Sequence, residues 1–209
     1  MKKDELLGEY RSRHLHILKP LAEKLTAHLV DNLKDLERID RISARAKSPD
    51  RFLAKALKAR EDGGAKYERP FEQIQDLVGA RVIVFYKQDV DVVTEVILRY
   101  YQPIEQKELI PEREIEFGYF GTHLILAFPE DLFEDDADRD RSPLFFELQI
   151  KTLFQHAWSE AEHDLAYKPS ADLTKLQKRL VALSAAQAWG ADLQFAQLHS
   201  ELGGAPPAK

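Results

Sequence analysis

The stretch of sequence that decides the fold is Leu144–Lys168, which reads LFFELQIKTLFQHAWSEAEHDLAYK. Its first residues alternate apolar and polar side chains, which predicts a strand, and residues 153–165 predict a helix directly after it. The alternation puts Glu147, Gln149 and Lys151 on one face of the strand. Because polar groups are costly to bury without partners, this face is expected to form one wall of a polar cleft.

Two more strands and four more helices are predicted on either side of this stretch. Runs of β-branched and aromatic residues predict strands at 81–86 and 122–128. Helical spacing of apolar residues, with helix-start and helix-stop signals, predicts helices at 4–38 (interrupted near Pro20), from Ser48 to Gly63-Gly64, at 89–101 and at 174–202. This order of elements indicates the α/β (α+β) class, a mixed β-sheet flanked by helices. We divide the chain into an N-terminal helical segment at 1–40, a central domain at 41–170, and a C-terminal helix with a tail at 171–209.

Composition excludes several classes of protein. The chain has 209 residues, 44% of them apolar, which rules out wholesale disorder. No run of apolar residues is long enough to span a membrane, and no secretory signal is visible, so a cytoplasmic protein without a membrane partner is expected. Cysteine is absent, which excludes disulfides and thiolate sites and fits a reducing compartment. The formal net charge of −6 argues against a general nucleic-acid coat.

Charge is unevenly distributed along the chain. Residues 41–60 contain seven basic side chains and one acidic one, and residues 130–141 contain seven acidic and two basic ones. The acidic run has no periodicity and is predicted to be a solvated loop. In the basic run, Lys47, Arg51 and Lys55 recur at helical spacing, so one helix face would carry them together. Such a face is either a solvated surface or a clamp for a polyphosphate.

Two short motifs also carry candidate chemistry. Asp76 and Arg81 flank Gly79 just before a predicted strand, an arrangement suited to a corner that binds Mg²⁺ and phosphate. In the segment FGYFGTH at 117–123, Tyr119 offers an aromatic face to a base and His123 a donor to a phosphate. Turns of both compositions are common, so neither motif is decisive alone.

Taken together and in this order, these segments resemble the synthetase domain of the RelA/SpoT family, specifically its single-domain small alarmone synthetases. The resemblance runs from about residue 41 to residue 168, and its final block, from Glu147 to Lys168, is highly specific. It implies a fold related to nucleotidyltransferases. It also implies the transfer of pyrophosphate from ATP to the ribose 3′-hydroxyl of GDP or GTP, which makes (p)ppGpp.

The resemblance also implies roles for individual residues. Asp76 and Glu147 would position Mg²⁺, and Glu147 would also serve as the base for the 3′-hydroxyl. Tyr119 would stack on the acceptor base. The ATP phosphates would lie on Arg45, Lys47 and Lys55, with Arg81 as a further contact. The remaining residues expected to line the nucleotide-binding site are Arg51, His123, Gln149, Lys151, His156, His163 and Lys168.

Several positions depart from the pattern of the family and leave the acceptor open. Phe120 follows Tyr119 where many members have a basic residue, Lys151 replaces the more frequent Arg, and His156 stands where many members have Asn. GDP or GTP is the leading acceptor. The alternatives are an adenine nucleotide, and the 3′-end of tRNA in a toxic relative that an antitoxin would accompany. A third hypothesis is a nucleotide-binding module without catalysis.

The flanking helices at 4–38 and 174–202 are more apolar than a solvated helix requires. They are expected to pack onto the sheet of their own chain, and the alternative is a contact in a homo-oligomer.

Overall fold

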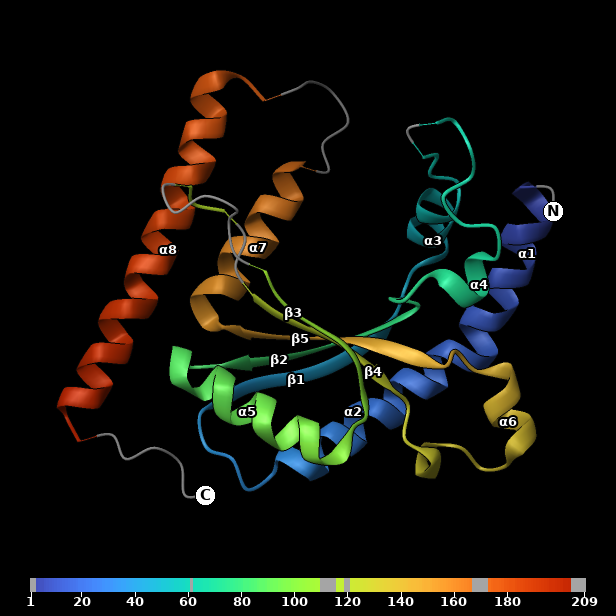
Figure 1. Cartoon of the computed structure of the whole chain (residues 1–209), viewed down its shortest axis with the longest axis horizontal. Coiled ribbons are helices and arrows are strands. Elements are labelled where there is room, and N and C mark those ends of the chain that lie inside the picture. Colours follow the sequence, from blue (N-terminus) through green and yellow to red (C-terminus); the bar gives the residue numbers. More distant parts are fainter. Residues whose placement is uncertain (1–2, 61, 110–115, 119–120, 167–172, 204–209) are drawn as a thin grey trace.

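A five-stranded mixed sheet forms the centre of the protein, with strand order β1-β2-β5-β4-β3 (Figure 1). The computed structural model describes residues 3–60, 62–109, 116–118, 121–166 and 173–203. The strands are β1 (Ile39–Ala46), β2 (Val78–Val84), β3 (Pro103–Leu109), β4 (Gly121–Ala127) and β5 (Phe145–Thr152). In this sheet β2 and β5 run parallel, and the other neighbouring strands named above pair antiparallel. The predicted mixed sheet is therefore confirmed.

Helices cover both faces of the sheet (Figure 1). They are α1 (Lys3–Arg13), α2 (Lys19–Leu33), α3 (Pro49–Ala56), α4 (Pro70–Gln73), α5 (Lys87–Tyr100), α6 (Asp136–Arg141), α7 (Leu153–Ala166) and α8 (Lys175–Glu201), with a π-helical turn at His14–Leu18 and a 3₁₀ turn at Glu130–Leu132. In Figure 1, α2 and α5 lie below the sheet, and α7 and α3 rise above it. Among the helices of the described residues, none is long and apolar enough to cross a membrane.

The main core lies between the sheet and the helices below it. Leu25 and Leu29 of α2 and Ile97 of α5 are fully buried against Leu124 and Leu148 of the sheet. The apolar stripe of the N-terminal helices is thus covered by the sheet of the same chain, as expected. Helix α8 differs, since large apolar side chains along it remain exposed; these include Leu176, Leu180, Leu183 and Leu198.

Helix α3 is held by an aromatic stack. Phe52 of α3 lies against Tyr10 of α1 with the ring centroids 3.7 Å apart, and both side chains are fully buried. The Tyr10 hydroxyl donates a hydrogen bond of 2.7 Å to the backbone carbonyl of Lys47. This contact fixes the chain where β1 turns into α3, and the basic residues of this segment are therefore carried on a rigid support.

The structure corrects several predictions of local structure. Strands β1 and β3 were not predicted, because both lie at the edges of the sheet and carry many charged side chains. The helix that begins after Ser48 ends at Ala56, well before the predicted end at Gly63-Gly64. The prediction that Lys47 shares a helix face with Arg51 and Lys55 is also wrong, because Lys47 precedes the helix. The acidic run at 130–141 is not one loop, since it forms the 3₁₀ turn and α6.

Candidate functional site

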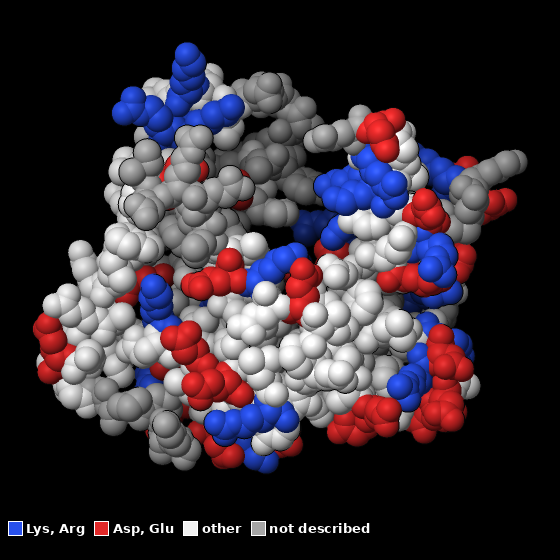
Figure 2. Space-filling view, in the orientation of Figure 1, with Lys and Arg blue, Asp and Glu red and all other residues white. Residues whose placement is uncertain are grey.

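A cleft of about 680 Å³ opens above the sheet, lined by β1, α3 and the facing parts of β2, β5 and α7. Figure 2 shows Lys and Arg side chains gathered beside the hollow between α7 and α3. Its lining includes two carboxylates, Asp76 and Glu147, and six cationic side chains, Arg45, Lys47, Arg51, Lys55, Lys58 and Arg81. Because the cations greatly outnumber the acids, the cleft is suited to bind a polyanion.

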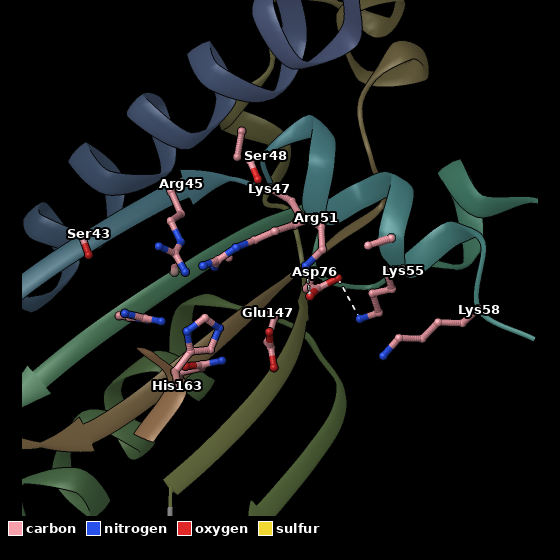
Figure 3. Close-up of a pocket in the computed structure, with 16 residues that line it drawn as sticks. Ser43, Arg45, Lys47, Ser48, Arg51, Lys55, Lys58, Asp76, Glu147 and His163 are labelled. Carbon is pink, nitrogen blue, oxygen red and sulfur yellow. Dashed lines mark hydrogen bonds and ion pairs between the residues drawn. The ribbon is translucent and has the colours of Figure 1, made fainter. Parts of the chain in front are cut away.

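Asp76 lies between two lysines at the base of the cleft. Its carboxylate accepts hydrogen bonds from Lys47 Nζ at 2.5 Å and from Lys55 Nζ at 2.9 Å (Figure 3). Burial favours the neutral acid, but these two ion pairs outweigh it and hold the pKa of Asp76 below its ordinary value. Asp76 is therefore ionised at neutral pH, and it fixes the positions of both ammonium groups.

Glu147 reaches the same cleft from β5, because Gly79 of β2 lies opposite it in the parallel pair. His123 Nδ1 donates a hydrogen bond of 2.8 Å to Glu147 Oε1, since an ionised carboxylate can only accept. Burial raises the pKa of Glu147, but the hydrogen bonds from His123 and Gln149 and the charge of His123 lower it by more than that. The pKa of Glu147 therefore lies below its ordinary value. The negative charge of Asp76 acts in the opposite direction, which places the two carboxylates within electrostatic range of each other.

Three arginines, Arg45, Arg51 and Arg81, stand close together in the cleft. Burial and the charges of Arg81 and Arg51 lower the pKa of Arg45, although a guanidinium remains charged at neutral pH. Arg81 Nη1 donates a hydrogen bond of 2.6 Å to Glu160 of α7, so one carboxylate offsets part of this concentrated charge. In Figure 3, Arg45 and Arg51 come from one side of the cleft, and His163 and Glu147 come from the other.

The far end of the polar strand face lies under α7. Lys151 is only 3% exposed and its ammonium donates a hydrogen bond of 3.2 Å to Ser159 Oγ. Burial is the largest cause that lowers the pKa of Lys151 to about 8, followed by the charge of Arg81. His156 lies beside this group on α7, and its buried Nδ1 has no hydrogen-bond partner. Both residues adjoin the cleft without lining it.

The structure brings together most of the site residues predicted from the sequence. Nine of them line the cleft: Arg45, Lys47, Arg51, Lys55, Asp76, Arg81, Glu147, Gln149 and His163. His123 contacts Glu147 directly, Lys151 is buried beneath the adjoining helix α7, and His156 lies on that helix. Tyr119 and Lys168 lie outside the described residues.

Sequence reasoning missed some residues of the site. The partner of Arg81, Glu160, could have been found because it stands one helical turn after His156 on a predicted helix. Ser43 also lines the cleft, and the signal for it was lost because β1 was not predicted.

The chemistry of the two carboxylates fits a bound Mg²⁺. Among the described residues there is no group of three or more His, Asp or Glu side chains placed to hold a metal ion. Mg²⁺ is commonly held by one or two carboxylates together with phosphate oxygens and waters. Asp76 and Glu147, both ionised and lining one strongly cationic cleft, match that donor set.

A mixed sheet that carries a strongly cationic cleft with two carboxylates has the charge and shape to accommodate a polyanionic ligand. The family model described as "Region found in RelA / SpoT proteins" matches residues 44–172, and the chain belongs to the RelA/SpoT family. Every lining residue except Ser43 falls within that match. The resemblance noted from the sequence is therefore confirmed.

Three comparisons with known proteins show how far the similarity extends. The GTP pyrophosphokinase YjbM of Bacillus subtilis (strain 168) is 25% identical over 133 residues, which are 63% of this chain and 60% of that relative. The crystal structure of the small alarmone synthetase 1 from Bacillus subtilis is 22% identical, with a TM-score of 0.72 over 97% of this chain and 98% of that one. A structure of the same synthetase bound to its product pppGpp is 22% identical, with a TM-score of 0.70 over 96% and 97% of the two chains. These structures confirm the fold along nearly the whole chain.

Proposed function

We propose that the protein is a diphosphotransferase that moves pyrophosphate from ATP to the ribose 3′-hydroxyl of GDP or GTP and so makes (p)ppGpp. The observation that carries the proposal is the combination of six cationic side chains with the Asp76–Glu147 pair in one cleft of about 680 Å³. Nucleotide-sized ligands occupy cavities of this order, roughly 300–1,000 Å³. Membership of the RelA/SpoT family and the curated GTP pyrophosphokinase relative support this reaction over other uses of a polyphosphate site.

The basic residues are proposed to hold the triphosphate of ATP. Arg45, Arg51 and Arg81 can each present a planar fork of N–H groups to phosphate oxygens, whereas Lys47 and Lys55 act as point charges. Transfer of a phosphoryl-type group depends mainly on positioning and on neutralising charge that develops on the bridging oxygens. Mg²⁺, held by Asp76 and Glu147 together with phosphate oxygens, would supply further neutralisation of this charge.

Glu147 is proposed to be the base for the acceptor. The 3′-oxygen of the acceptor bonds to the β-phosphorus of ATP, the bond from that phosphorus to the α,β-bridging oxygen breaks, and AMP leaves. The hydroxyl proton passes to the Glu147 carboxylate, which is ionised at neutral pH because its pKa is lowered. His123 holds the carboxylate in one orientation through its 2.8 Å hydrogen bond.

The acceptor is proposed to lie at the α7 side of the cleft. The buried Oε1 of Gln149 has no hydrogen-bond partner, so a ligand donor at this wall would satisfy it. His163 lines the same side, while Lys151 supports α7 from beneath through Ser159 and His156 lies on α7 itself. Tyr119 is proposed to stack on the base of the acceptor, as the resemblance to the family implies.

An acceptor screen tests this function. Purified protein is incubated with γ-labelled ATP and Mg²⁺, in parallel with GDP, GTP, adenine nucleotides and tRNA. Label on GDP or GTP is the expected result, and omission of Mg²⁺ should abolish it. Label on tRNA would instead identify the toxic activity that an antitoxin would restrain, and label on an adenine nucleotide would identify an adenine alarmone.

Glu147→Gln tests the proposed role of Glu147 as the base, because it keeps the shape of the side chain and removes its charge. It should lose nearly all turnover and still bind a non-hydrolysable ATP analogue. If the wild-type protein labels no acceptor, the proposal of pyrophosphate transfer is wrong. ATP binding without turnover would then favour a nucleotide-binding module without catalysis.

A further inference from the structure

A second cavity, of about 220 Å³, lies on the opposite face of the sheet from the cleft. Paired residues of neighbouring strands point to the same face, and successive residues point to opposite faces. His123 pairs with Gln149 on the cleft face, and Thr122 pairs with the buried Ile150 on the other face. Because Thr122 lines the second cavity, this cavity is separated from the cleft by the sheet itself.

The cavity contains a buried carboxylate with an unused oxygen. Asp192 of α8 is 4% exposed, and its Oδ2 accepts a hydrogen bond of 2.8 Å from Thr152 Oγ1. Its Oδ1 is also buried and has no hydrogen-bond partner. Burial raises the pKa of Asp192 to about 6, so the carboxylate is still ionised at neutral pH. Buried polar atoms without partners are rare, and Asp192 is one of the residues that line the cavity.

The surroundings of Asp192 favour a cation over an anion. Asp91 and Glu108 also line the cavity, and Lys87 is the one basic residue among the described residues of the lining. Trp189 of α8 forms part of the wall and is 40% exposed, so its ring is available for a cation–π contact. The cavity is far larger than the roughly 30 Å³ share of one water molecule, so a single water would not fill it.

We infer that this cavity binds a small organic cation, a protonated primary amine or a guanidinium, that donates to Asp192 Oδ1 and packs on the ring of Trp189. A nucleotide fits poorly, because its phosphates would meet Asp91 and Glu108. The inference does not depend on the proposed transfer reaction, since it concerns another face of the sheet and its test measures binding alone.

Calorimetric titration of the full chain tests the inference. The probes are agmatine, methylguanidine and n-butylamine, with n-butanol as a neutral ligand and butyrate as an anionic one. Saturable binding of at least one cation at millimolar concentration or below is expected, with no heat from n-butanol or butyrate. Absence of saturable binding by all three cations, or equal binding of n-butanol, would overturn the inference.

Two variants locate the site. Asp192→Asn should weaken cation binding at least tenfold, because the amide removes the charge and retains the shape. Glu95→Gln makes the same chemical change at an exposed position of α5 that does not line the cavity, and it should bind as the wild type does. A fluorescence titration gives a second readout: in a Trp158→Phe background, the emission of Trp189 should change with the same midpoint. If Asp192→Asn binds the cation as tightly as the wild type, or if Trp189 emission stays constant during the titration, the cation binds elsewhere and the proposal is contradicted.

Discussion

Glu160 is predicted to compete with the phosphates of ATP for Arg81. The two side chains form an ion pair of 2.6 Å, and Arg81 also lines the cleft that we propose for ATP. A guanidinium that donates to a carboxylate must exchange that partner, at least in part, when a phosphate arrives. Glu160→Gln removes the competing charge and keeps an acceptor of similar shape, so we expect this variant to bind an ATP analogue more tightly.

The magnitude follows from the exposure of the pair. The Glu160 side chain is 50% exposed and the Arg81 side chain 23%, so solvent screens their attraction. Exposed ion pairs contribute about 0.2–1 kcal/mol. If nucleotide binding disrupts the ion pair completely, the wild type must give up this energy on binding and Glu160→Gln does not. The variant should then have a Kd for the ATP analogue lower by up to about fivefold, because 1.4 kcal/mol corresponds to a factor of about ten.

Isothermal titration with a non-hydrolysable ATP analogue measures this difference. It should be carried out at low salt and again near 0.5 M salt, where screening should reduce the gain. Glu95→Gln, which removes the carboxylate of an exposed ion pair with Arg99 on α5, is the matched control and should leave Kd unchanged. Unaltered or weaker binding by Glu160→Gln at low salt would refute the competition, and weaker binding would show that Glu160 instead orients Arg81 for the nucleotide.

Three further predictions concern stability. Asp89→Ala leaves the partly buried guanidinium of Arg38 without its partner at 2.9 Å, and urea denaturation should show a loss of about 3–5 kcal/mol. Phe52→Ala empties a fully buried site that stacks on Tyr10, and it should cost about 3–5 kcal/mol in the same assay; a loss below 1 kcal/mol would contradict the role assigned to the stack. Asp192 has its folded pKa raised by burial to about 6, so its protonation favours the folded state and the stability it confers is lost as pH rises from about 4 through 6. Asp192→Asn should therefore be more stable than the wild type at pH 8, with the difference vanishing near pH 4, and a constant difference across this range would be inconsistent with the shifted pKa.

The parts of the fold that could be predicted are those with a strong local signal. Strand β5 was predicted from the alternation around Glu147, and α8 from a long helical run at 174–202; the structure adds that Thr174 caps this helix together with Gln177. The edge strands β1 and β3 had no such signal. Most side chains of β3 are exposed and those of β1 are at most half-buried, so the apolar pattern that would separate these strands from loops is weak.

The candidate site shows the same limit. The residue types of the cleft were evident from the sequence, but their arrangement was not. The sequence pattern predicted Lys47 and Lys55 on one helix face, whereas the structure places Lys47 before α3 and joins the two lysines through Asp76. The helical position of Glu160, one turn after His156, could be read from the sequence, but its pairing with Arg81 could not, because it connects α7 to β2.

The parallel pairing of β2 with β5 has a consequence for folding kinetics. Gly79 and Glu147 are neighbours in the sheet but lie far apart along the chain, with α5, β3, β4 and α6 between them. Contacts of such long sequence separation raise contact order and slow folding, because the intervening chain must close a large loop first. The two carboxylates of the cleft meet only when this loop has closed. In a refolding experiment, recovery of nucleotide binding should therefore follow the slowest phase and lag behind the return of helical signal.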